Sequence, residues 1–192
     1  MKQFLFIVTA LYFTQNVFGQ GGSTGLIPIC DLQTARYKNY QGGLYPNGAN
    51  KRPESHDSIG MAFSKQILPV DYQGIVNQQN GKYVFLSIGM SNTTQEFSTF
   101  KTMADADNSK NPKLVIVDGA QGGQTAAIIS NPGAAFWTTI EQRLQNAGVS
   151  AKQVQICWVK EADAGPTQAF PVHANTLTDE LTAIANILKQ KY

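Results

Sequence analysis

The feature that most constrains the fold is a regular alternation of strand-like and helix-like segments from residue 82 onward. Three short runs are rich in β-branched and aromatic residues, which is typical of strands: Lys82 to Ile88, Lys113 to Val117 and Gln153 to Val159. Each run is followed by apolar residues at helical spacing, within residues 93–103, 134–146 and 176–189. This order predicts right-handed βαβ crossovers, and therefore an α/β fold of three layers, α/β/α, with a parallel sheet like that of flavodoxin. Thr93 and Glu96 are spaced as a capping box that starts the first of these helices.

The N-terminal residues predict export from the cell. Lys2 precedes an apolar run at residues 4–13, and Val17-Phe18-Gly19 resembles a cleavage site. We therefore expect a signal peptide at 1–19, a loop-rich arm at 20–80 and an α/β domain at 81–192, in a secreted or periplasmic protein. The apolar run is shorter than the roughly 20 residues of a membrane span, and no cysteine follows it directly, so no membrane anchor is expected.

Composition narrows the possible partners. Apolar residues make up 42% of the chain, charged residues 15%, and the formal net charge is +2, so the chain is globular and has no basic stripe for nucleic acid. The glycines of 119–123 do not form the G-x-G-x-x-G fingerprint of dinucleotide binding, and we expect no cofactor. Cys30 and Cys157 lack metal-ligand spacing, and no metal is expected. The two thiols either form a disulfide or remain separate.

Ligand sites in such folds lie at the carboxyl ends of the strands, so the loops after the three strands are the candidate site. Ser91 follows the first strand and precedes a helix, a position that suits a nucleophile and equally suits a residue that starts the helix. Gly122 and Gly123 follow the second strand, where their N–H groups could bind an oxyanion or could simply form a tight turn. Asp163 lies in a charged cluster after the third strand that either faces the cleft or is a solvated turn.

Together these loops resemble the conserved blocks of the SGNH/GDSL-type hydrolases. Ile88-Gly89-Met90-Ser91-Asn92 resembles the first block, Gly119-Ala120-Gln121-Gly122 the second, and Lys160 to Asp163 falls where the third lies. A group of secreted bacterial SGNH-like proteins is more similar still, through Gly42 to Pro46, Ser87 to Phe97 and Val117 to Gln124. The resemblance implies that Ser91 is the nucleophile, that Gly122 or Gly123 supplies an oxyanion N–H, and that Asp163 occupies the position of an oxyanion-binding Asn.

Three departures from this pattern affect the expected activity. Met90 replaces the usual Asp of the first block, and an ionised Asp163 cannot donate a hydrogen bond as Asn would. The family places an Asp-x-x-His motif near its C-terminus, but here Tyr192 ends the chain where a further strand is expected. The two histidines, His56 and His173, lack that context. We therefore expect either a fragment or a protein without the standard base.

The resulting functional hypothesis is a secreted hydrolase domain acting on a small-molecule or carbohydrate ester, such as an acylated sugar. The alternative is a non-catalytic secreted binding protein, or a truncated pseudoenzyme, on the same fold. For the hydrolase hypothesis, we expect Ser91 and the Gly122 amide to lie at the same sheet edge within about 10 Å, because oxyanion-binding groups must converge on the nucleophile.

Overall fold

A computed structural model of the protein describes residues 25–192, so the expected signal peptide at 1–19 lies outside the described residues. The described chain falls into two compact units, the first ending at Ser58 and the second spanning Ile59–Tyr192. None of the helices formed by residues 25–192 is long and apolar enough to cross a membrane.

The first unit is built from short elements. They are α1 (Ile29–Leu32), an antiparallel pair of β1 (Arg36–Tyr37) and β2 (Tyr40–Gln41), and the 3₁₀ turn η1 (Pro46–Gly48). The residues expected to form a loop-rich arm also contain α2 (Glu54–Ser64), an eleven-residue helix that crosses the boundary between the units and buries none of its side chains.

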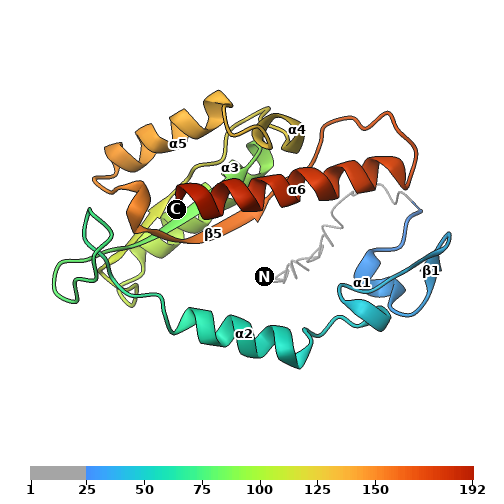
Figure 1. The fold of residues 1–192 in the computed structure, drawn as a ribbon, viewed down its shortest axis with the longest axis horizontal. Coiled ribbons are helices and arrows are strands. Elements are labelled where there is room, and N and C mark those ends of the chain that lie inside the picture. The colour runs from blue at the N-terminus through green and yellow to red at the C-terminus, as the bar shows by residue number, and fades with distance from the viewer. Residues whose placement is uncertain (1–24) are drawn as a thin grey trace, which may run out of the picture. The chain divides into compact units, whose positions relative to one another are not determined.

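The second unit is a mixed α/β fold around a three-stranded parallel sheet (Figure 1). Its strands are β3 (Tyr83–Gly89), β4 (Leu114–Val117) and β5 (Val154–Lys160), in the order β4-β3-β5. The three predicted strands are therefore confirmed to within a residue at each end, as is their parallel direction. Because β3 is central, the loops after β4 and β5 emerge on either side of the loop after β3.

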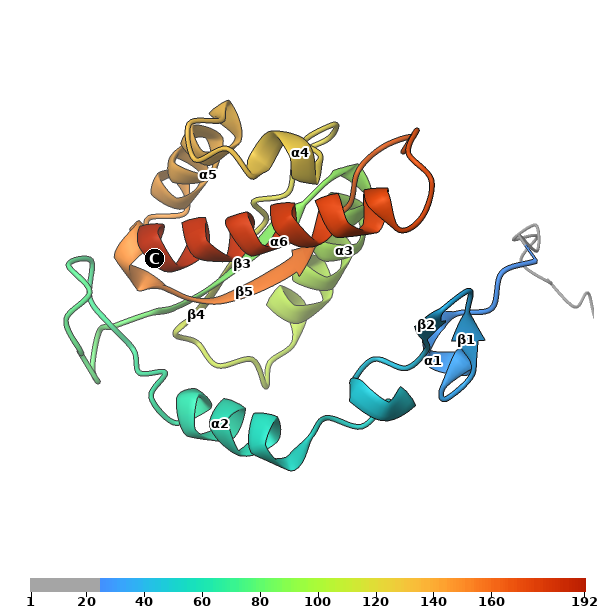
Figure 2. The same cartoon turned by 45° about the vertical axis from the view of Figure 1, so that its right-hand side comes forward.

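Helices flank this sheet (Figure 2). They are α3 (Ser91–Ala106), α4 (Ala126–Ile129), α5 (Ala135–Asn146) and α6 (Val172–Lys191), with the 3₁₀ turn η2 (Ala151–Gln153) before β5. The final helix begins four residues earlier than its apolar spacing predicted, and it packs against α4. The predicted α/β class is thus confirmed.

The core forms because β3 is apolar on both of its faces, as a central parallel strand requires. Leu86 and its alternate neighbours are fully buried in one cluster with Trp137 of α5 and Ile184 of α6. On the opposite face, Phe85 meets Phe97 of α3 edge to face, with ring centroids 5.2 Å apart.

The predicted capping box at the start of α3 is wrong. The helix begins at Ser91, two residues before the predicted cap, and no side chain caps it. The Thr93 hydroxyl instead donates to the Lys160 carbonyl at 2.7 Å, and the Glu96 carboxylate pairs with the Lys160 ammonium. Tertiary partners on β5 have replaced the local partners that the motif assumes.

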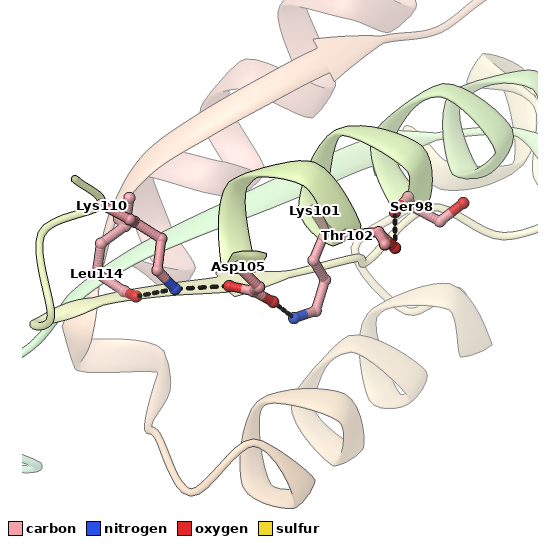
Figure 3. A network of polar contacts seen from close by, with 6 residues as sticks. All are labelled: Ser98, Lys101, Thr102, Asp105, Lys110 and Leu114. Carbon is pink, nitrogen blue, oxygen red and sulfur yellow. Dashed lines mark hydrogen bonds and ion pairs between the residues drawn. The ribbon is translucent and has the colours of Figure 1, made fainter. Parts of the chain in front are cut away.

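A carboxylate at the other end of α3 secures the turn into β4 (Figure 3). Asp105 forms ion pairs with Lys101, one turn earlier on the helix, and with Lys110 of the turn. The two ammonium groups hold the pKa of the Asp105 carboxyl below its usual value, first through their hydrogen bonds. Lys110 also donates to the Leu114 carbonyl at the start of β4, so the pair connects helix, turn and strand.

Candidate functional site

The sheet places Ser91 where the central strand turns into a helix. Ser91 is the first residue of α3 and is exposed. A side chain at Gly89, two residues earlier, would fall on the Lys160 carbonyl oxygen and the Thr93 hydroxyl. The strand-to-helix turn therefore requires glycine, and its tight packing against β5 fixes where Ser91 emerges.

The loop after β4 is held by a buried hydroxyl on β3. Ser87 is completely buried, and its hydroxyl donates to Asp118 Oδ1 at 2.6 Å. The same Ser87 oxygen accepts the N–H groups of Gly119 at 3.0 Å and Ala120 at 3.3 Å. The Asp118 carboxylate also accepts the Ala120 N–H, so Asp118 orients the loop.

Two side chains on other elements, and one within the loop, also hold it in place. Arg143 of α5 donates to the carbonyls of Asp118 and Ala120, each at 2.8 Å. Thr94 of α3 also donates to the Ala120 carbonyl, and the Gln121 amide side chain donates to the Gly119 carbonyl. These hydrogen bonds hold the loop after β4 in place up to residue 121.

The prediction that Ser91 and Gly122 converge is confirmed. A Cβ built on Gly122 would lie 3.8 Å from the Ser91 Cβ. The N–H groups of Ser91, Gly122 and Gly123 donate no hydrogen bond to any residue within 25–192. A hydroxyl with nearby unpaired amides is an arrangement that can attack a carbonyl carbon and stabilise the oxyanion formed.

The third predicted site residue, Asp163, anchors the loop after β5 to the start of α4. Its Oδ1 accepts the Ala127 N–H at 3.0 Å, and the neighbouring Ala162 carbonyl accepts the Ala126 N–H. An oxygen that accepts an amide proton supplies no hydrogen-bond donor to an oxyanion, whereas the side-chain amide of an Asn would.

Two glutamates around Asp163 have raised pKa values. Burial raises the pKa of the Glu161 carboxyl from 4.5 to about 7; the Ala162 N–H opposes this rise and the Asp163 charge adds to it. The Oε2 atom of Glu161 is enclosed and has no hydrogen-bond partner among residues 25–192. On α6, the pKa of Glu180 is raised by burial, by a hydrogen bond with Asp163 and by the Asp163 charge, while His173 lowers it.

Ser87, Arg143 and Glu180 were not among the residues predicted from the sequence. Ser87 carried a signal, because it is the one hydroxyl in the interior of an otherwise apolar strand. Arg143 and Glu180 occupy helix positions that look like ordinary surface positions, and they reach the loops only through the tertiary fold.

The remaining candidates from the sequence are a histidine and two cysteines. His56 belongs to the first unit, and Cys30 and Cys157 are each a free thiol in the structure. Burial raises the pKa of the Cys157 thiol to about 11. Within the described part of the chain, no three or more His, Cys, Asp and Glu side chains gather closely enough to hold a metal ion.

Comparison with known protein families, with curated proteins and with solved structures gives no match to this chain.

Proposed function

We propose that this chain is a hydrolase domain that cleaves carboxylic esters through Ser91. The observation that carries the proposal is the approach of Gly122 to Ser91 beside amides that donate no hydrogen bond to any residue of 25–192. Attack by the Ser91 hydroxyl would move negative charge onto the carbonyl oxygen of the ester, where the amides of Ser91 and of Gly122 or Gly123 stabilise it. An acylated carbohydrate is the substrate class implied by the resemblance to SGNH/GDSL-type hydrolases.

We also propose that the domain has the three-layer α/β/α arrangement of the SGNH type and that the protein is exported from the cell. Both rest on the sequence. The export proposal predicts cleavage close to Gly19, which N-terminal sequencing of the exported protein tests. Intact Met1 on exported material would refute it.

We expect the activity to be weak. A hydroxyl at its ordinary pKa is a poor nucleophile without a base beside it, and general-base assistance is typically worth about 10²–10⁴-fold. No described residue hydrogen bonds to the Ser91 hydroxyl. The oxyanion-binding amides would then supply most of the rate enhancement, which is about 10³-fold over water in enzymes that have lost their catalytic triad.

The test is turnover of p-nitrophenyl acetate by wild type, Ser91→Ala and the control Ser98→Ala. Ser98 is an exposed serine two turns further along α3. Ser91→Ala should lower the rate by about two- to tenfold, and Ser98→Ala should leave it unchanged. Equal rates for wild type and Ser91→Ala would refute the proposal. A larger loss would show that a base acts on Ser91, and His56 is the first candidate to replace.

One observation favours the alternative of a non-catalytic binding protein. By the resemblance, Asp163 stands where those hydrolases have an Asn donor, and in the structure its Oδ1 is an acceptor, taking the Ala127 N–H. A carboxylate near the oxyanion would raise the barrier to ester cleavage. Turnover that does not depend on Ser91 would favour this second function.

A further inference from the structure

We propose that Ser87 is a positioning residue of the Ser91 site, because its buried hydroxyl sets the loop that brings the Gly122 amide against Ser91. The inference rests on the function proposed above. Ser87 lies on the central strand β3, four residues before Ser91 in the chain. It acts through the loop after β4 and not on the substrate.

The hydrogen-bonding capacity of this hydroxyl is used entirely by the loop after β4. A serine hydroxyl has one proton to donate and two lone pairs to accept. Ser87 donates its proton to Asp118 Oδ1 at 2.6 Å, a charge-assisted bond, and accepts the N–H groups of Gly119 and Ala120. An apolar side chain would suit the packing of a central strand equally well, so the polar group at this position serves the loop.

The loop has no space to move closer to the strand. A Cβ on Gly119 would lie 2.5 Å from the Ser87 carbonyl oxygen, which shows how closely the two backbones approach. If the hydroxyl is removed, the buried Gly119 N–H loses its partner, and the half-buried Asp118 carboxylate loses a donor. The loop can recover those bonds only by moving outward, which carries Gly122 away from Ser91.

The last backbone hydrogen bond before Gly122 shows whether the loop is in place. The Gln121 N–H donates to the Gly89 carbonyl at 2.9 Å, and residues 122 and 123 are exposed. Hydrogen exchange at the Gln121 amide therefore measures how often the loop leaves its seat, independently of any ester chemistry.

The first arm of the experiment is kinetic and uses p-nitrophenyl acetate with the full chain. Ser87→Ala should lower the Ser91-dependent turnover about fivefold and leave KM within about twofold, because the displaced loop holds Gly122 further from the oxyanion; a fivefold loss corresponds to about 1 kcal/mol of transition-state stabilisation. The double variant Ser87→Ala/Ser91→Ala should match Ser91→Ala alone. Asp118→Asn, which keeps an accepting oxygen but loses its charge, should lie between wild type and Ser87→Ala.

The control removes a buried polar side chain at the opposite end of the sheet. Gln153 is buried at the end of η2, directly before β5, where it donates to the Val70 carbonyl and accepts the Ser150 N–H. Gln153→Met should lower the melting temperature yet keep the Ser91-dependent turnover within about twofold. This separates the positioning of the loop from a general loss of stability.

The second arm is amide hydrogen exchange at Gln121. Exchange should become at least about fivefold faster in Ser87→Ala at neutral pH and should not change in Gln153→Met. An unchanged Gln121 rate in Ser87→Ala, or full retention of Ser91-dependent turnover, would overturn the inference. If Ser91→Ala does not lower turnover in wild type, the proposed hydrolase function fails, and the exchange rate alone then decides whether Ser87 positions the loop.

Discussion

Replacement of Glu161 by Gln should make the stability of the protein less dependent on pH. The Glu161 carboxyl is half-buried, and its pKa is raised from 4.5 to about 7 mainly because burial disfavours the charged form. In the unfolded chain the same carboxyl loses its proton near its ordinary pKa. Between these two values the unfolded state releases the proton first, so the contribution of Glu161 to stability is present at low pH and is lost as the pH rises through about 7.

The size of this effect follows from the pKa change. A fully buried carboxyl with the same rise would lose about 3.4 kcal/mol of unfolding free energy across this range, at 1.36 kcal/mol for each pH unit. Since Glu161 is only half-buried, solvent screening reduces the expected loss to about 1 kcal/mol. A neutral Gln does not titrate, so Glu161→Gln should be more stable than wild type by about 1 kcal/mol near pH 8, with little difference near pH 4.

Urea unfolding of wild type and Glu161→Gln between pH 4 and pH 8 measures the difference in their unfolding free energy. Subtracting one curve from the other removes the titration of all other groups. Asp163→Asn is the companion variant, because loss of the neighbouring charge should lower the pKa of Glu161 and move the pH-dependent window downward. If the stability difference between Glu161→Gln and wild type is the same at every pH, the carboxyl does not have a raised pKa and the reasoning fails.

Three further predictions concern the Ser91 site and the turns around the sheet. Asp163→Asn should raise Ser91-dependent ester turnover at least about tenfold, because the Asn side-chain NH₂ group supplies a hydrogen-bond donor while its oxygen still accepts the Ala127 N–H of α4. An unchanged rate would place residue 163 away from the oxyanion. Asp105→Asn should lower the unfolding free energy in urea by about 0.5 kcal/mol near neutral pH, and the difference should vanish as the pH falls through the lowered pKa of Asp105. Gly89→Ala should cost at least about 3 kcal/mol by thermal unfolding, whereas Gly122→Ala, which has space for a methyl group, should cost less than about 1 kcal/mol.

The strands could be predicted from the sequence because their signal is local. The run from Lys82 to Ile88 places apolar residues on both faces of a strand, and β3 occupies nearly the same positions. The meeting of Ser91 and Gly122 was also predictable, because parallel strands end at one edge of their sheet. The central place of β3 in the strand order was not predictable, since the order depends on how the crossovers pack.

The connections that hold the site could not be predicted, because they join residues far apart in the chain. Ser87 and Asp118 are 31 residues apart, and Arg143 reaches the Asp118 carbonyl from 25 residues away. The capping box failed for the same reason. Thr93 has the right neighbours for a local cap, but the Lys160 carbonyl, 67 residues away, takes its hydroxyl.

The positions of the two tryptophans provide optical probes of two different parts of the second unit. Trp137 is almost fully buried, and its indole N–H donates to the carbonyls of Ile129 and Asn131, both at 3.1 Å. Trp158 is half-buried and stacks on Phe97 with ring centroids 5.6 Å apart, beside an apolar groove of about 330 Å³. Fluorescence from Trp137 should therefore be emitted at shorter wavelengths and be shielded from acrylamide, whereas acrylamide should reach Trp158. With one tryptophan replaced at a time by phenylalanine, the emission of the other would follow events in the core or beside the groove separately.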